Sequence, residues 1–207
     1  MSPLQNNMNE YDVFMALCMG VGLSAAAGFR VFMPPFLLSV LVRADTVEID
    51  VKGTAFEYFD SDIAVFLLGS ATLIELLAYY IPWVDNLLDS IATPAAVIAG
   101  TGMTSMLLEG STDPVLQWSL AIIAGGGVSA SIQGATGITR GASTMLTGGI
   151  GNPAVSTVEN IASIIFALVA ILLPFVAAFG AAFLVAVVVR KAINKGRNLA
   201  HSEGPPS

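Results

Sequence analysis

The sequence predicts an all-α membrane protein that crosses the lipid bilayer several times. Of its 207 residues, 55% are hydrophobic and only 11% are charged, whereas a soluble domain carries about 25% charged residues. The mean hydropathy is +0.79. At roughly 20 residues per span, the chain accommodates five or six short, glycine-rich transmembrane helices in one domain over residues 11–190. We expect a flexible N-terminal tail at 1–10 and a basic, then polar, C-terminal tail at 191–207.

Composition excludes several classes of function. The net charge is −7, with 8 Lys+Arg against 15 Asp+Glu, so the chain lacks the basic surface of a nucleic-acid-binding protein. Cys18 is the only cysteine and His201 the only histidine. This excludes an internal disulfide, a histidine-rich metal site and the usual Ser–His or Cys–His catalytic pair. We therefore expect no cofactor, no metal and no catalytic residue.

The first apolar stretch, 13–42, is interrupted by Arg30 and by Pro34-Pro35. Proline removes a backbone donor and clashes with the preceding turn, so the pattern predicts a helix broken near 28–35. The acidic segment 43–61 predicts a loop with a surface helix. A second span is expected over 62–81, with Glu75 well inside it.

The second half of the chain leaves the number of spans open. Pro94 fits the first turn of a third span ending near Leu108, and a fourth span is expected over 114–133. The polar, glycine-rich segment 134–153 predicts an external loop or a re-entrant segment lining a cavity. The last apolar run, 157–189, has Pro174 in its middle and predicts either one kinked helix or two short ones.

Basic residues gather at the end of that run, at Arg190, Lys191, Lys195 and Arg197. By the positive-inside rule this places the C-terminus in the cytoplasm. The expected location is the bacterial inner membrane.

An internal repeat is predicted over residues 11–109 and 114–190. The set Ala16, Gly20, Gly22, Ser24 and Ala25 aligns without gaps to Ala121, Gly125, Gly127, Ser129 and Ala130. Small residues four apart share one helical face and allow close packing; the candidates are Gly20, Ser24, Gly28, Gly125 and Ser129. Three segments per half would invert the second half relative to the first, as in many transporters. Coincidence in glycine-rich sequence is the alternative.

Charged residues within the apolar sequence are the candidate functional site. Placing one charge at a helix centre costs about 2.5–3.5 kcal/mol on insertion scales, so we expect ion pairs between Arg30 and Glu75 and between Arg140 and Glu159. Asn152, in the glycine-rich run 148–153, is a further candidate for binding an anion. These pairs either fix helix packing or bind an anion, because the planar guanidinium fork suits carboxylate and phosphate. Asp85 and Asp89, four apart, predict a wet helical face or a cation site.

Several motifs together resemble one known family. They are Gly28-Phe29-Arg30, the stretch Ile81-Pro82-Trp83-Val84-Asp85-Asn86-Leu87-Leu88-Asp89 followed by Thr93-Pro94, and the run Gly148-Gly149-Ile150-Gly151-Asn152-Pro153 with Ser156-Thr157-Val158-Glu159. The chain resembles, over roughly residues 10–190, small bacterial and plant membrane proteins grouped as domain of unknown function 4126. The resemblance implies a compact helical membrane domain and carries no activity or functional residue with it.

Two functions from different classes fit these observations. The first is a transporter or channel for an anionic solute or anionic lipid headgroup, which uses the intramembrane Arg/Glu pairs. The second is a non-catalytic scaffold or accessory subunit that packs on other membrane helices through its small-residue faces. The expected partners are the bilayer, an anionic small molecule or lipid, and a second copy of the chain; nucleic acid is not expected.

Overall fold

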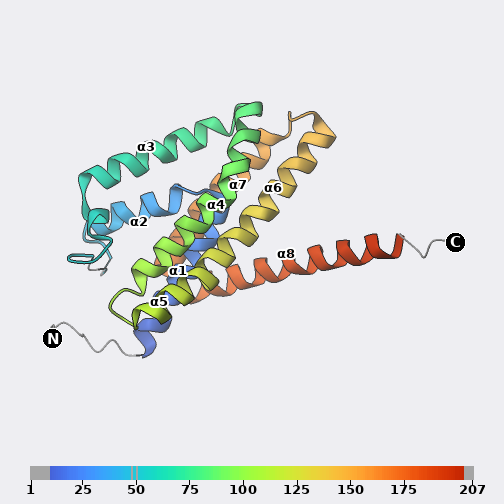
Figure 1. The fold of residues 1–207 in the computed structure, drawn as a ribbon. Coiled ribbons are helices and arrows are strands. Elements are labelled where there is room, and N and C mark those ends of the chain that lie inside the picture. The colour runs from blue at the N-terminus through green and yellow to red at the C-terminus, as the bar shows by residue number, and fades with distance from the viewer. Residues whose placement is uncertain (1–9, 48, 50, 203–207) are drawn as a thin grey trace.

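The computed structural model describes residues 10–47, 49 and 51–202, and within these ranges the chain contains helices and connections but no strand (Figure 1). In chain order the elements are α1 (Glu10–Phe29), α2 (Met33–Arg43), η1 (Glu57–Asp60), α3 (Asp62–Ala78), α4 (Pro82–Leu107), α5 (Pro114–Leu120), η2 (Ala121–Gly126), α6 (Gly127–Thr147), α7 (Asn152–Leu172) and α8 (Pro174–Ser202). The predicted all-α class is confirmed. Residues 1–9, which make up nearly all of the predicted N-terminal tail, lie outside the described residues.

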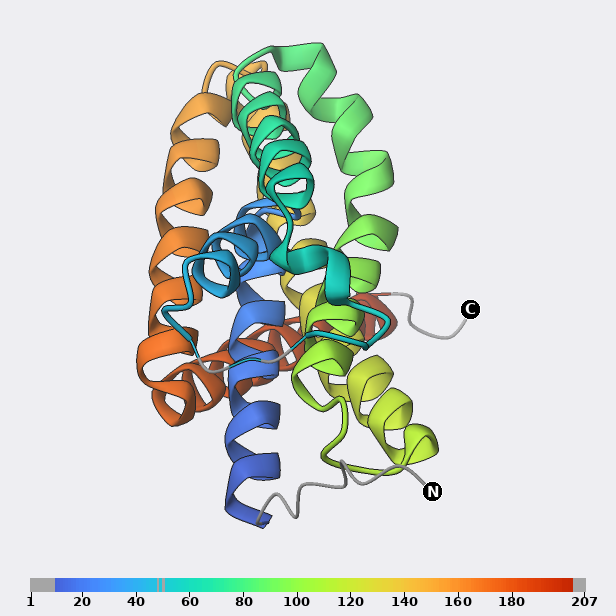
Figure 2. The same ribbon diagram turned by 90° about the vertical axis from the view of Figure 1, so that its left-hand side faces the viewer.

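Helix α1 lies at the centre of the bundle, in contact with α4, α6, α7 and α8 (Figures 1 and 2). The Ser24 hydroxyl donates to the Gly100 carbonyl of α4 at 3.0 Å, and the Ser163 hydroxyl of α7 donates to the Ala26 carbonyl at 3.0 Å. Because α4 and α7 both run antiparallel to α1, these contacts join helices that alternate in direction.

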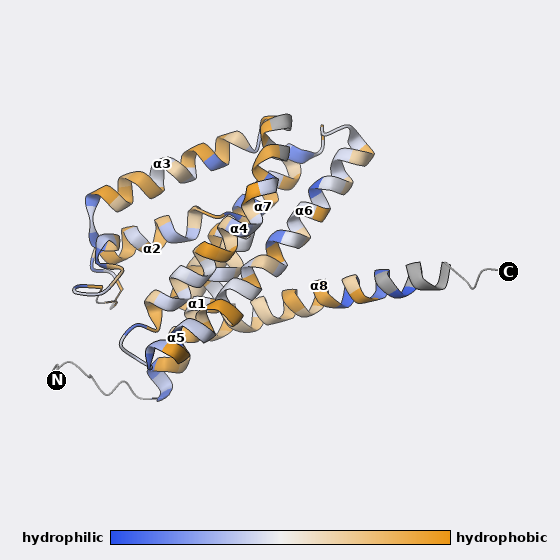
Figure 3. Ribbon diagram, viewed as in Figure 1, coloured by the Kyte–Doolittle hydropathy of each residue, from blue (hydrophilic) through white to orange (hydrophobic). Residues whose placement is uncertain are grey.

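Many of the buried positions of the bundle carry small or polar side chains, while many large apolar side chains are exposed. Figure 3 shows hydrophobic residues along every long helix. Fully buried positions include Ser24, Ala27, Thr104, Ser129 and Ser163, each with no exposed surface. By contrast, Phe66, Ile123, Leu172, Phe179 and Phe183 are between 68% and 77% exposed. A large apolar surface around a small-residue core is the arrangement of helices packed in lipid, so the chain is a membrane protein.

Five helical segments are long and apolar enough to cross a bilayer: Glu10–Phe29, Leu87–Leu107, Pro114–Thr147, Asn152–Leu172 and Pro174–Lys195. The predicted break after the first of these is confirmed, since α1 ends at Phe29 and α2 begins with Pro34 and Pro35 in its first turn. The predicted second span is α3, which has only 17 residues, fewer than the roughly 20 that a span needs. Helices α2 and α3 pack against each other on one flank of the bundle.

Two predicted boundaries are wrong. Pro94 lies inside α4, which already begins at Pro82. The segment 134–153 is neither a loop nor re-entrant, because α6 continues to Thr147 and only residues 148–151 form a turn. The polar residues of α6 explain this result, since Ser129, Gln133, Thr136 and Arg140 recur at helical spacing and all are buried. They form one inward-facing stripe.

The last apolar run consists of two helices, α7 and α8. Leu173 separates them with φ −140° and ψ 66°, outside the helical region. Helix α8 then continues through the basic residues as far as Ser202, so the first part of the predicted C-terminal tail is helical.

The structure does not confirm an inverted repeat. Gly20 of α1 and Gly125 of η2 both face Thr104, and Ser24 and Ser129 both lie against Gly100. Moving four residues along either segment, from Gly20 to Ser24 or from Gly125 to Ser129, moves the contact from Thr104 to Gly100 of α4. Therefore α1 and η2–α6 run in the same direction. An inverted repeat requires them to be antiparallel. The aligned residues instead mark two neighbouring helices that both pack on Gly100 and Thr104 of α4 through equivalent small residues.

Candidate functional site

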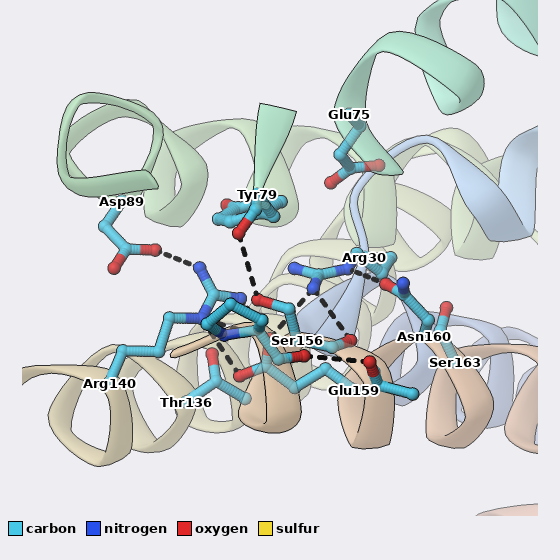
Figure 4. A network of polar contacts seen from close by, with 12 residues as sticks. Arg30, Glu75, Tyr79, Asp89, Thr136, Arg140, Ser156, Glu159, Asn160 and Ser163 are labelled. Atoms are coloured by element: carbon cyan, nitrogen blue, oxygen red, sulfur yellow. Dashed lines mark hydrogen bonds and ion pairs between the residues drawn. The ribbon is translucent and has the colours of Figure 1, made fainter. Parts of the chain in front are cut away.

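Four charged residues meet near the end of the bundle that carries the α3–α4 and α6–α7 turns (Figures 1 and 4). Arg140, Asp89 and Glu159 each lie seven residues from the helix ends at Thr147, Pro82 and Asn152. At 1.5 Å per residue they are therefore about 10 Å below that end. Arg30 joins them from the break between α1 and α2. We call Arg30, Arg140, Glu159 and Asp89 the charge cluster.

Glu159 holds both arginines. Its Oε2 lies 3.2 Å from Arg30 Nη2, and Arg140 Nε donates to its two oxygens at 3.2 and 3.0 Å. Arg140 Nη2 also donates to Glu159 Oε2. The predicted Arg140–Glu159 ion pair is thus present in the structure. Because one carboxylate serves two guanidinium groups, its removal would leave two cations facing each other in the interior.

Arg140 has two further partners from the α3–α4 corner. Its Nη1 donates to Asp89 Oδ1 at 2.5 Å, and its guanidinium carbon lies 4.0 Å from the centroid of the Tyr79 ring. The ring provides a cation–π contact. The interpretation of Asp89 as a cation ligand or part of a wet face is therefore wrong, because its carboxylate points to an arginine.

Arg30 shares that ring and is also held by α7. Its guanidinium carbon lies 4.0 Å from the Tyr79 centroid, its Nε donates to Asn160 Oδ1, and its Nη2 donates to the Ser156 carbonyl at 3.1 Å. Among the described residues, none accepts a hydrogen bond from the buried Nη1. The arginine side chain is 0% exposed, so this N–H is a buried donor that could serve one further acceptor.

Glu75 does not pair with Arg30, and that prediction is wrong. Its Oε1 accepts from the Val31 amide at 2.8 Å and its Oε2 from the Phe32 amide at 3.0 Å. These amides lie where α1 has ended and α2 has not yet begun, so no helix carbonyl is in place for them. In Figure 4, Glu75 lies on the same side of the arginines as Tyr79 and Asp89, while Glu159, Ser156 and Asn160 lie on the other.

The other candidate residues have positions outside the charge cluster. Asn152 lies at the α6–α7 turn, where its amide donates to Thr144 Oγ1 at 3.0 Å, two helical turns along α7 from Glu159. The five small-residue candidates lie in close contacts within the bundle, and a Cβ added at Gly28 would sit 2.5 Å from Ile132 Cβ.

Sequence reasoning missed Tyr79, Ser156 and Asn160 as partners of the arginines. A tyrosine at the end of an apolar helix gives no periodic signal, and the Ser156 contact uses its main chain. Asn160 follows Glu159 directly, so the dipeptide Glu159-Asn160 in an apolar run was the one available signal.

The cluster is balanced in charge and shielded from solvent. Arg30 and Arg140 carry two positive charges, which Glu159 and Asp89 match, while backbone amides stabilise the separate charge of Glu75. Side-chain exposure is 0% for Arg30, 1% for Arg140 and 5% for Glu159. Two guanidinium groups directed at one carboxylate form a set of donors that suits carboxylate and phosphate anions.

A comparison with models of known protein families shows which family the chain belongs to. The model for domain of unknown function 4126 matches residues 17–193, which is most of the sequence, and the chain belongs to this family. No curated protein and no solved structure matches.

Proposed function

We propose that this member of the family transports an anion, either an anionic solute or an anionic lipid headgroup, across the bacterial inner membrane. Arg30 and Arg140 bind the anion, and Glu159 carries a coupled proton. The observation that supports this most strongly is the pair of fully buried arginines joined by one carboxylate, with Arg30 Nη1 lacking an acceptor among the described residues.

The proposed step is an exchange at the arginines. When Glu159 binds a proton it loses its attraction for both guanidinium groups, and the charge cluster becomes positive by one. One monovalent anion restores neutrality by binding in its place. The groups facing this position are Arg30 from α1, Tyr79 and Asp89 from the α3–α4 corner, and Arg140 from α6. Asp89 stays paired with Arg140 throughout.

The free-energy cost of having neither a charged Glu159 nor an anion beside the two arginines couples proton binding to anion binding. Leaving a buried charge unpaired costs about 3–5 kcal/mol, so the state with protonated Glu159 and no anion is rare. Likewise, an anion that arrives while Glu159 is charged is repelled by it. Proton and anion therefore bind together, which is the requirement for symport.

The proposal includes an orientation in the membrane. It takes the five apolar segments to cross alternately, so that α8 ends on the side of the α6–α7 turn. The basic residues Arg190, Lys191, Lys195 and Arg197 at that end place it in the cytoplasm. The charge cluster then lies about 10 Å inside the cytoplasmic end of the bundle.

The scaffold alternative has less support. It requires a small-residue face that is free to pack on another protein. Gly20, Gly28 and Gly125 instead contact Thr104 and Ile132 of the same chain, at positions where a Cβ would collide. These three glycines are thus used for packing inside the bundle, which favours the transport proposal over a scaffold that docks through them.

Flux in proteoliposomes tests the proposal. Purified protein is reconstituted in phosphatidylcholine liposomes with an internal pH-sensitive dye, and gradients of phosphate, sulfate, succinate and glycerol phosphate are imposed in turn. We expect at least one of these anions to drive proton movement about tenfold above that in protein-free liposomes, and Arg30→Gln combined with Arg140→Gln to abolish it, because loss of both cations removes several kcal/mol of binding.

Two matched variants complete the experiment. Glu159→Gln should keep exchange of the labelled anion but lose the proton movement, since glutamine does not carry a proton in this role. Arg43→Gln should behave as the native protein, because Arg43 is an exposed arginine paired with Asp62 away from the charge cluster. Proton movement that survives in the double arginine variant would contradict the proposal. Its absence with all four anions would contradict transport of a soluble anion.

A further inference from the structure

Glu159 also lines an apolar groove on the outer side of the charge cluster. The groove lies where α1 ends and between α6, α7 and α8, and it has a volume of about 460 Å³. Its walls include Phe29, Ile132, Val155 and Leu184, and Glu159 is the only charged residue that lines it in the described part of the chain. This volume falls within the usual range for ligand sites, about 300–1,000 Å³.

We propose that the groove holds the acyl chain of an anionic lipid whose headgroup exchanges with Glu159 at Arg30 and Arg140. This inference rests on the proposed function and names its substrate class. A small soluble anion needs no apolar wall beside its binding residues. An anion attached to a hydrocarbon chain needs the two surfaces that meet at Glu159.

The surroundings of the groove fit entry from the bilayer. Val158, next to Glu159 on α7, is 67% exposed, and the outer faces of α7 and α8 carry Ile161, Leu172, Phe179 and Phe183, all at least half exposed. These faces lie in lipid in a membrane protein. A chain entering between them stays in an apolar environment over its whole path.

Burial of the arginines makes Glu159 the point of entry. Arg30 and Arg140 are 0% and 1% exposed, whereas Glu159 both lines the groove and binds the two guanidinium groups. A headgroup arriving along the groove thus meets the carboxylate that it has to replace. It then brings an acceptor oxygen to Arg30 Nη1, which has none among the described residues.

Photo-crosslinking with two lipids tests the inference. The native protein is placed in phosphatidylcholine nanodiscs containing a trace of either phosphatidic acid or phosphatidylcholine, each with a diazirine at the same mid-chain position. Labelled peptides are then mapped. We expect phosphatidic acid to label groove peptides from α6, α7 and α8 about tenfold more strongly than phosphatidylcholine, equivalent to about 1.4 kcal/mol.

Matched substitutions on one helix locate the binding. Ala135→Phe fills the groove and should remove the preference for phosphatidic acid, whereas Ala142→Phe, on an exposed position of α6 outside the lining, should keep it. Ala154→Leu provides a second, smaller filling change from α7, and thermal unfolding confirms that each variant is folded. Equal labelling by the two lipids, or a preference that survives both filling variants, would overturn the inference.

The flux assay separates this result from the proposed function. If phosphate or succinate drives proton movement through the arginines while the groove shows no lipid preference, the transport proposal stands and the lipid inference falls. If neither is seen, both fall. Preferential labelling of the groove that persists in Arg30→Gln also overturns the inference, because the headgroup would then not need the arginine.

Discussion

Glu75 stabilises a broken helix rather than an arginine. The break after Phe29 leaves the amides of Val31 and Phe32 without helical acceptors, and in lipid no water is present to replace them. The two carboxylate oxygens accept from these amides at 2.8 and 3.0 Å. The break carries Arg30 into the interior, so Glu75 positions Arg30, the proposed anion-binding residue, through the main chain.

Replacing Glu75 should therefore act on stability. Each buried donor left unsatisfied costs about 1–3 kcal/mol, so Glu75→Leu, which removes both acceptors, should lower the free energy of unfolding by about 2–6 kcal/mol. Chemical unfolding in mixed micelles, followed by circular dichroism, measures this change. Glu57→Leu is the control, because Glu57 lies on an exposed position of η1; its effect should stay within about 0.5 kcal/mol. Equal effects of the two changes would show that the carboxylate is not needed at the break.

The sequence indicated which residues are charged inside the membrane but only some of their partners. Arg140 and Glu159 lie on consecutive helices joined by a short turn, so their pairing follows from local geometry. Arg30 lies beside Ser156, Glu159 and Asn160 because α7 packs antiparallel to α1, with Gly22 against Ala170. That register depends on tertiary packing, which no local pattern in a single sequence reports.

At the scale of helices, close packing through small residues sets the register of the bundle. Gly28 of α1 lies against Ile132 and the Ser129 carbonyl of α6, where an added Cβ would be 2.5 Å from Ile132 Cβ. Gly134, on the same helix as Ile132, has nothing within 4 Å of an added Cβ. Glycine is thus required at position 28, where Ile132 leaves no room for a Cβ, but not at position 134.

Alanine substitution at these two positions should give opposite results. Alanine favours a helix over glycine by about 1 kcal/mol, so Gly134→Ala should be neutral or slightly stabilising. Gly28→Ala should instead lower the free energy of unfolding by about 1–3 kcal/mol, the usual cost of overpacking. Thermal unfolding of the two variants side by side measures the difference. A stabilised Gly28→Ala would mean that α1 and α6 are further apart than described here.

Helical periodicity predicted where apolar helices lie but not where polar ones continue. Residues 134–147 contain glycine, serine and threonine in a pattern typical of a loop, yet they form the second half of α6. Ser129, Gln133, Thr136 and Arg140 lie on one buried face, so the helix places its polar side chains inward. In a membrane protein the polar stripe faces the interior, and composition alone does not distinguish such a stripe from a loop.

For the whole molecule, the class and the membrane character were predictable, and the relation between the halves was not. Composition and hydropathy predict a helical membrane domain because a low charge content leaves no water-facing surface. The inverted arrangement was expected from three segments per half. However, α2 and α3 have 11 and 17 residues and lie on the flank, so only α1 and α4 cross before α5–α6. An even number of crossings makes α1 and α6 parallel.

This crossing pattern makes a prediction about the two ends of the α5–α6 segment. Val115 and Met145 are 77% and 89% exposed and lie 30 residues apart in one continuous helical segment, which includes η2. At about 1.5 Å per residue they are about 45 Å apart, more than the roughly 30 Å thickness of the hydrocarbon core. The two positions should therefore lie on opposite sides of the membrane.

Cysteine labelling in intact cells measures which of these two positions faces the cell exterior and which faces the cytoplasm. In a Cys18→Ser background, an impermeant maleimide should label Val115→Cys from outside and Met145→Cys only after the cells are permeabilised. Lys195→Cys, at the basic end of α8, should behave like Met145→Cys, because α8 crosses toward the cytoplasm in the proposed orientation. Labelling of Met145→Cys and Lys195→Cys from opposite sides would mean that α8 lies along the bilayer instead of crossing it. The charge cluster would then remain near the α6–α7 turn, but its assignment to the cytoplasmic side would depend on Met145 alone.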